Sequence, residues 1–247
     1  INPFFMYFYS ENLKNWRDSE TGPNFPLPGI ENVDDVNMWY AGMNLDANFN
    51  AASIWLTGIY QGGDVDLGGP EAVDFKAWLG AGGFSVNMPF GDVHGQAFYA
   101  TGPDAEEDEI VEFFVPAGQS YYWSEIMGYG LFGDTSYYTN TVDKFHGDQI
   151  GNIMAANLGV KIKPMPQLTI ALDAWYAALA EDIVIPGTNN EENYLGTEID
   201  LRITYQLVQG LNLDIVGAYL FAGDVTTLND KNEADPYEVG SMLSLSF

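Results

Sequence analysis

Regular alternation of apolar and polar residues is the feature that most constrains this chain. Successive side chains of a β-strand point to opposite faces, so alternation over about ten residues predicts a strand with one apolar face. The alternating stretches span residues 2–9, 36–49, 52–62, 73–88, 93–102, 150–163, 168–180, 194–208, 211–223 and 237–247. The sequence therefore predicts an all-β protein of about ten strands, in a single domain over residues 1–247.

The connectors between these stretches alternate strictly in length. The short ones are 50–51, 89–91, 164–166 and 209–210, and the long ones are 10–35, 63–72, 103–149, 181–193 and 224–236. Short turns make neighbouring strands antiparallel and bring all the long connectors to one end of the sheet. This pattern is typical of transmembrane β-barrels, which have short periplasmic turns and long extracellular loops.

Aromatic residues on the apolar phase fall near the strand ends. Such rings prefer the boundary between lipid and water, so two bands of them predict a lipid-facing surface. A soluble β-sandwich gives no reason for this sorting. The residues near the long connectors are Trp39, Tyr60, Tyr99, Tyr176, Tyr219, Phe221 and Tyr237, and those near the short turns are Phe49, Tyr205 and Phe247.

The last stretch alternates and ends on Phe247, as bacterial outer-membrane barrels do. We therefore expect an antiparallel transmembrane β-barrel in the bacterial outer membrane. No charged segment with a following apolar run stands at Ile1, so we expect any signal peptide to have been removed or omitted. Ten strands enclose a narrow lumen, whereas an aqueous pore takes about sixteen. The chain is thus expected to be a small plugged barrel or part of a larger one.

Acidic residues dominate the charge balance. The chain has 35 Asp and Glu against 8 Lys and Arg, a formal charge of −27, which excludes nucleic acid as a partner. Much of the excess lies in the long connectors, where carboxylates beside phosphorylated lipopolysaccharide suggest bridging by Ca²⁺ or Mg²⁺. The candidate ligands are Asp104, Glu106, Glu107, Asp108 and Glu109. A solvated acidic surface is the alternative, and no cofactor is required.

Polar residues of the other phase are expected to line the lumen. The candidates are Lys76, Lys161, Lys163, Asp173, Glu198, Asp200, Arg202 and Asp214. In a narrow barrel Arg202 would pair with Glu198 or Asp200, and in a wider one these charges would bias ion selectivity. In stretch 73–88 the apolar phase switches across Gly82 and Gly83, which predicts a glycine bulge.

The long connector 103–149 is unusually aromatic. Its candidate residues for a constriction or a partner contact are Phe113, Phe114, Tyr121, Tyr122 and Trp123. We expect the connector to fold into the lumen, pack over its mouth or meet a partner. Catalysis is not expected, because the only histidines are His94 and His146 and no nucleophile motif accompanies them.

Three segments resemble the alginate-export-like family of outer-membrane barrels and related porins. They are Phe84–Gly102, Tyr194–Tyr205 and Leu211–Asp224, and the likeness lies in the style of their strands. The resemblance implies an outer-membrane channel for small or oligomeric polar solutes. An alginate exporter is expected to have a strongly basic conduit, whereas the inward set here has few Lys and Arg. An inward set with few basic residues suits cations or neutral solutes better than a polyanion.

The sequence thus favours a porin-like channel for passive diffusion of small polar solutes or cations. One alternative is a non-conducting structural barrel that anchors or binds partners through its acidic, aromatic loops. Another is a soluble calcium- or sugar-binding β protein. Whether the chain forms a homo-oligomer stays open.

Overall fold

Ten strands and one short helix make up the computed structural model, which describes residues 1–11, 35–66, 72–103, 109–115, 123–128, 150–185, 188–227 and 235–246. The strands are β1 (Asn2–Ser10), β2 (Asp35–Phe49), β3 (Ala52–Asp66), β4 (Val73–Met88), β5 (Gly91–Ala100), β6 (Ile153–Met165), β7 (Leu168–Val184), β8 (Glu191–Val208), β9 (Leu211–Ala222) and β10 (Tyr237–Leu245). The helix α1 is Asp224–Thr227. In the described part of the chain, no helix has the length and apolarity needed to cross a membrane.

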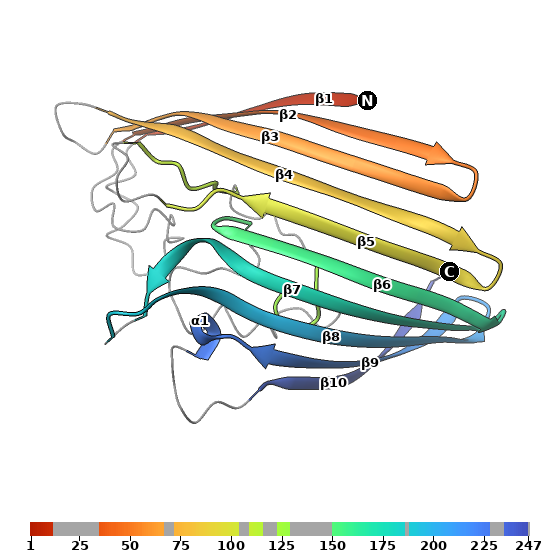
Figure 1. The fold of residues 1–247 in the computed structure, drawn as a ribbon. Coiled ribbons are helices and arrows are strands. Elements are labelled where there is room, and N and C mark those ends of the chain that lie inside the picture. The colour runs from red at the N-terminus through yellow and green to blue at the C-terminus, as the bar shows by residue number, and fades with distance from the viewer. Residues whose placement is uncertain are drawn as a thin grey trace.

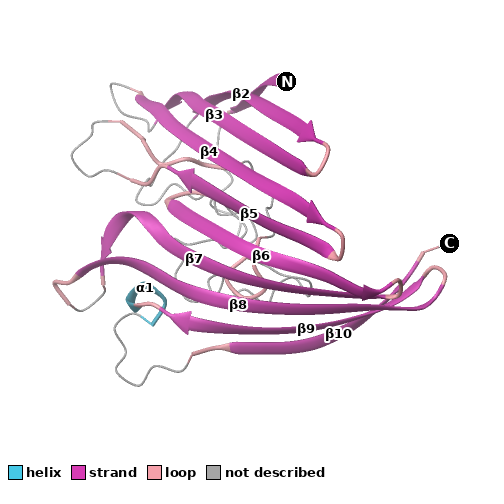
Figure 2. Cartoon of the chain, turned by 45° about the vertical axis from the view of Figure 1, so that its right-hand side comes forward, coloured by secondary structure: helices cyan, strands magenta, loops and turns pink. Residues whose placement is uncertain are grey.

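All ten strands form one antiparallel sheet in the order of the chain, from β1 to β10. Figures 1 and 2 show this sheet as a curved layer with the hairpin turns gathered at one end and the longer connections at the other. The all-β prediction is confirmed. Over the described residues the two edge strands, β1 and β10, pair only with β2 and β9, so the sheet is open.

Several strands extend further than the alternation predicted. β3 continues to Asp66, which pairs with Asp35 of β2, and β7 and β8 continue to the pair Val184 and Glu191. These extensions are rich in charged residues and glycine, which hides them from a search for apolar alternation. Backbone pairing needs no apolar face, so the ladder runs beyond the alternating region.

The predicted bulge at Gly82 and Gly83 is wrong. The pairing of β3 with β4 runs one-to-one from Ala52 and Val86 to Val65 and Val73, without a shift. Register shifts occur instead in the pairings of β6, β7, β8 and β9. The apolar phase of β4 switches because its two halves meet different surroundings. Phe75 is buried in a core on one face, whereas Phe84 is exposed on the other.

The two faces of the sheet differ sharply. The inner face carries the buried core, and the outer face is apolar yet exposed. The core includes Val36, Met38, Tyr40, Val65, Phe75, Ala77, Phe98, Trp175, Leu195 and Leu220. Exposed residues on the outer face include Phe49, Leu56, Tyr60, Trp78, Phe84, Leu158, Leu172, Tyr176, Leu201, Ile215, Tyr219 and Leu243.

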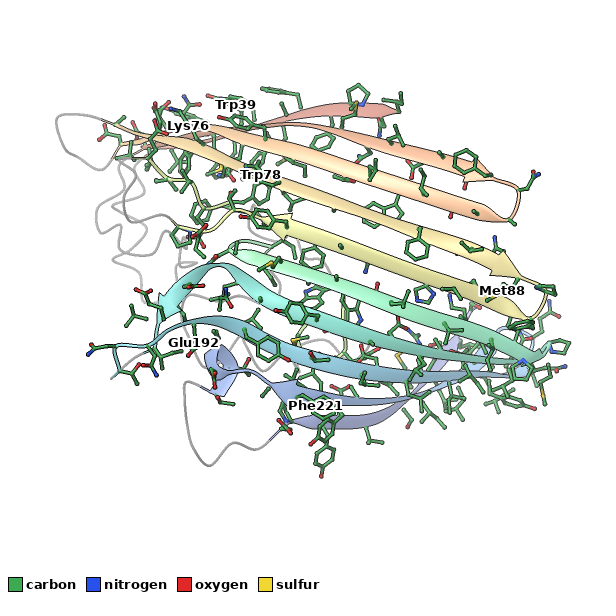
Figure 3. The ribbon with its side chains drawn as sticks, in the orientation of Figure 1. Trp39, Lys76, Trp78, Met88, Glu192 and Phe221 are labelled. Atoms are coloured by element: carbon green, nitrogen blue, oxygen red, sulfur yellow. The ribbon has the colours of Figure 1, made fainter. Side chains whose placement is uncertain are left out.

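Rings of the outer face gather at the end that bears the long connectors, here called the loop end; the other is the turn end. Ring pairs there join neighbouring strands, with centroids 5.6 Å apart for Trp39 and Tyr60 and 4.9 Å apart for Trp78 and Tyr99. Figure 3 shows Trp39, Trp78 and Phe221 towards this end, and Met88 at the turn end.

Candidate functional site

Two segments of the connector between β5 and β6 lie against the inner face. The first, residues 109–115, begins by extending the sheet, because Ile110 bridges to Phe75 and exchanges backbone hydrogen bonds with Asp74 and Lys76. Its Phe113 and Phe114 are 4% and 9% exposed and lie within the core.

Buried polar groups hold Phe114 in place. The backbone N–H of Phe114 donates to Gln61 Oε1 at 2.8 Å, and the Tyr40 hydroxyl donates to the Phe114 carbonyl at 2.8 Å. Gln61 is fully buried, and its amide oxygen gives the Phe114 N–H the partner that a buried donor needs. Nearby, burial raises the pKa of the Glu112 carboxyl to about 7.

The second segment, residues 123–128, closes over β8 and is here called the latch. Glu198, which is fully buried, accepts hydrogen bonds from the Ser124 hydroxyl at 3.0 Å and from the backbone N–H groups of Ile126 and Met127 at 2.6 and 2.8 Å. Asp200 Oδ2 accepts a fourth from the Glu125 N–H at 3.3 Å. Glu198 accepts three of these four hydrogen bonds, so it is the anchor of the latch.

Below the latch, towards the turn end, the inner face lines a cavity of about 930 Å³. Its walls combine charged and amide side chains with indole rings. They include Trp55, Asp92, His94, Trp123, Glu125, Asn157, Lys161, Asp173, Trp175, Asp200 and Arg202. A large pocket with a few convergent polar groups is the default candidate for a binding or transport site.

A histidine bridged by two carboxylates forms one wall of this cavity. His94 Nδ1 lies 2.9 Å from Asp92 Oδ1, and Nε2 lies 2.9 Å from Asp173 Oδ1. Asn157 also donates to Asp173 Oδ1, at 2.7 Å. Gly159 stands between His94 and Asp173 in the register, and a Cβ there would overlap both side chains. The glycine thus lets His94 reach across β6.

This histidine does not form a nucleophile and base pair in the structure. Ser85 lies directly opposite His94 on the neighbouring strand, a position from which a serine could use the ring as a base. Both ring nitrogens, however, already face carboxylates. The expectation that the protein is not an enzyme stays a prediction.

Arg202 pairs differently from the two options expected. It contacts Asp214 of β9 at 3.3 Å and not Glu198 or Asp200, which the latch covers. Thr204 donates to the same Asp214 oxygen at 2.5 Å. Neighbouring strands bring Arg202 and Asp214 to one face, whereas the latch segment, distant in sequence, takes the other two carboxylates.

Lys76 lies on the opposite face from that predicted. In β4 the core takes Phe75 and Ala77, so Lys76 projects outward in phase with Trp78 and pairs with Glu109. Figure 3 labels Lys76 and Trp78 near the loop end. The structure thus places Lys76 on the outer face and not on the predicted inner face, because Phe75 and Ala77 take the inner positions in the core.

The structure places the other predicted residues as follows. Lys161 and Asp173 line the cavity, and Lys163 is exposed in the irregular stretch before the β6–β7 turn. Glu109 is paired with Lys76. Tyr121, Tyr122, Asp104, Glu106, Glu107 and Asp108 lie outside the described residues. Among the residues that are described, no group of three or more His, Asp or Glu is arranged to hold a metal ion.

Sequence reasoning missed several cavity residues, among them Trp55, Asp92, Ser124 and Trp175. Asp92 was missed because the predicted strand began one residue later. Trp55 and Trp175 occupy the inward phase, where only polar residues were sought. A comparison of the chain with protein-family models and with curated proteins finds no match.

Proposed function

We propose that the ten strands belong to a transmembrane β-barrel of the bacterial outer membrane, and that this barrel is a porin-like channel for passive diffusion of small polar solutes or cations. The observation that carries the proposal is the opposite character of the two faces at the turn end. There the outer face exposes Leu158, Leu172 and Leu201, while the inner face carries Asp173 and Arg202. Apolar residues outside and polar residues inside are the pattern of an outer-membrane barrel.

Exposure of large side chains supports a lipid-facing role for the outer face. Leu158 of β6 is 60% exposed and Leu172 of β7 is 46% exposed. Large exposed apolar side chains on every strand except β5 are far more than a soluble monomer tolerates. The aromatic bands at its margins fit the two lipid–water boundaries, which weighs against the soluble calcium- or sugar-binding alternative.

Membrane insertion requires closure of the sheet. The free edges of β1 and β10 have backbone groups that lipid cannot satisfy. Under the proposal these edges pair with each other, with further strands or with a second copy of the chain. The resemblance to alginate-export-like porins and the bridging of acidic loops to lipopolysaccharide by Ca²⁺ or Mg²⁺ belong to the same proposal.

The path through such a channel would pass the latch. The loop-end half of the inner face is filled by Phe113, Phe114 and Trp123, so a permeating solute must pass beside this segment or displace it. The aromatic connector is thus the candidate constriction. The same filling supports the alternative of a non-conducting structural barrel, which would keep this plug in place.

Recording from a planar lipid bilayer tests the proposal. Protein refolded into detergent and added to the bilayer should give discrete conductance steps, and a salt gradient should show a preference for cations. The variant E198Q, which weakens the latch anchor, should increase the conductance or the open time. Silence from protein shown to be inserted, in both wild type and E198Q, would contradict the channel and favour the structural barrel.

A further inference from the structure

Three neutral polar groups on one wall of the cavity make no hydrogen bond within the described part of the chain. They are the hydroxyls of Ser53 and Ser85 and the indole N–H of Trp55. All three residues line the cavity and are partly exposed. None of the three polar atoms is fully buried, so each is open to water in the cavity. A solute can therefore bind them without breaking a hydrogen bond inside the protein.

The register of the strands places these groups side by side. Ser53 pairs directly with Ser85 across the β3–β4 ladder, and Trp55 pairs with Gly83 two residues further along each strand. Neighbouring strands lie about 4.8 Å apart, and residues on one face recur about every 6.6 Å along a strand. One small solute can thus contact the indole and both hydroxyls together.

The indole ring of Trp55 reaches over the neighbouring strand. A Cβ at Gly83 would come within 2.5 Å of Nε1 and 2.7 Å of Cε2 of this ring. The missing side chain at Gly83 therefore makes room for the ring above the backbone of β4, and the ring borders the cavity there. An indole offers a large apolar surface with a single polar N–H. The wall thus combines an apolar platform with hydroxyls at its margin.

The charged groups that line the cavity are already engaged with one another. His94 lies 2.9 Å from both Asp92 and Asp173. The two basic side chains, Lys161 and Arg202, each have a carboxylate nearby, at 3.9 and 3.3 Å. A charged solute would have to compete with these partners, whereas an uncharged solute would meet the open neutral groups. The wall formed by β3 and β4 therefore suits an uncharged, hydroxylated solute.

We infer that this wall binds a neutral sugar, whose ring carbons pack on Trp55 and whose hydroxyls hydrogen-bond with Ser53 and Ser85. A pyranose ring has a face of C–H groups and a rim of hydroxyls, and hydroxyls both donate and accept, as those of serine do. The inference rests on the proposed channel function and names its substrate class, which is uncharged, unlike the polyanion of an alginate exporter. The cavity of about 930 Å³ has room for such a sugar together with water.

Saturation-transfer NMR of the folded protein, in a detergent without a sugar headgroup, tests the site with glucose as the probe. Sorbitol keeps the hydroxyls but has no ring, and glucuronate adds a carboxylate to the ring. Glucose should bind about fivefold or more tightly than sorbitol, because only a closed ring presents a preformed apolar face. It should also bind more tightly than glucuronate, because the open groups are neutral. Equal affinity for glucose and sorbitol, or tighter binding of glucuronate, would overturn the inference.

Variants locate the binding on this wall. W55L removes the aromatic ring and should weaken glucose binding about tenfold, and S53A combined with S85A should weaken it about fivefold. The matched controls are W78L and S241A, because Trp78 and Ser241 are exposed on the outer face and do not line the cavity. Equal weakening by W55L and W78L, or by the serine variant and S241A, would overturn the site. Circular dichroism of each variant checks that it is folded.

The two proposals fail separately. Binding of glucose by a protein that is silent in the bilayer would leave the site standing and contradict the channel. Conductance that glucose neither blocks nor shifts, in a protein that does not bind it, would leave the channel standing and contradict the site.

Discussion

The two halves of the inner face differ in what covers them: a protein core covers the loop-end half, and a cavity lies against the turn-end half. At the loop end, Phe75, Phe98 and Leu220 form a dry core with Phe113 of the connector. At the turn end, polar groups such as Asp173 face a cavity instead. The outer face is apolar along both halves. The comparison teaches that one sheet can use its inner face partly as a protein core and partly as a polar surface, with the latch at the boundary.

The largest expected effect concerns the outer face, which the two halves share. Leu172 lies on β7 between the two aromatic bands, and L172R would place a charge in lipid at a cost of about 2–4 kcal/mol. The adjacent A171R faces the cavity and should fold into vesicles much better. Urea unfolding in phospholipid vesicles compares the two. A similar loss of folding stability in L172R and A171R would contradict the assignment of the outer and inner faces.

Substitution of Glu198 should loosen the latch, which lies at the boundary between the two halves of the inner face. E198Q replaces an acceptor of three hydrogen bonds by an amide that cannot accept all of them, which should cost about 2–3 kcal/mol. Limited proteolysis should then cut within the latch segment 123–128. D46N, on the same face but outside the cavity lining, should leave the cleavage pattern unchanged. Protection in E198Q equal to the wild type would show that packing alone holds the latch.

The segment beside the dry core should respond to pH. Burial raises the pKa of Glu112 from 4.5 to about 7, so the protonated form is favoured in the folded state. Its contribution is fully present below about pH 4.5 and is lost as the pH rises through about 7, by about 3 kcal/mol at most. The melting temperature of the wild type should therefore fall between pH 5 and pH 8 relative to that of E112Q. A constant difference between the two proteins would contradict this.

A smaller loss of folding stability is expected from a substitution in the turn-end half, at Gly159. In G159A the new Cβ would overlap His94 and Asp173, which must move apart at a cost of about 1–2 kcal/mol. The control is G58A, because a Cβ at Gly58 meets no atom within 4 Å. Denaturant unfolding measures both. If G58A lowered the free energy of unfolding as much as G159A, the cause would be the lost flexibility of the glycine backbone and not the overlap with His94 and Asp173.

Alternation predicted the positions of the strands because a strand with one apolar face is visible in the sequence alone. It could not tell which surroundings that face meets. In β4, Phe75 and Trp78 are both apolar, yet one lies in the core and the other on the outer face, so the orientation of Lys76 was predicted wrongly. Alternation reports polarity, and both faces are apolar near the loop end.

Contacts between distant segments were out of reach for a different reason. In the latch, Ser124 donates a hydrogen bond to Glu198, which is 74 residues away in the sequence. The row of His94, Gly159 and Asp173 depends on the registers of two separate ladders. The turns and the register shifts set these pairings, and the short-range pattern of a single sequence does not contain them.

The central claim is that the outer face meets lipid and the inner face meets water at the turn end. The chain has no cysteine, so single cysteines for spin labels can be placed along β6 from Met154 to Ile162 without background. In proteoliposomes, labels at Met154, Ala156, Leu158, Val160 and Ile162 should be accessible to oxygen in the lipid. Labels at Asn157 and Lys161 should instead be accessible to a water-soluble nickel complex. Alternation with period 2 would confirm the account, and uniform accessibility to the nickel complex would contradict it.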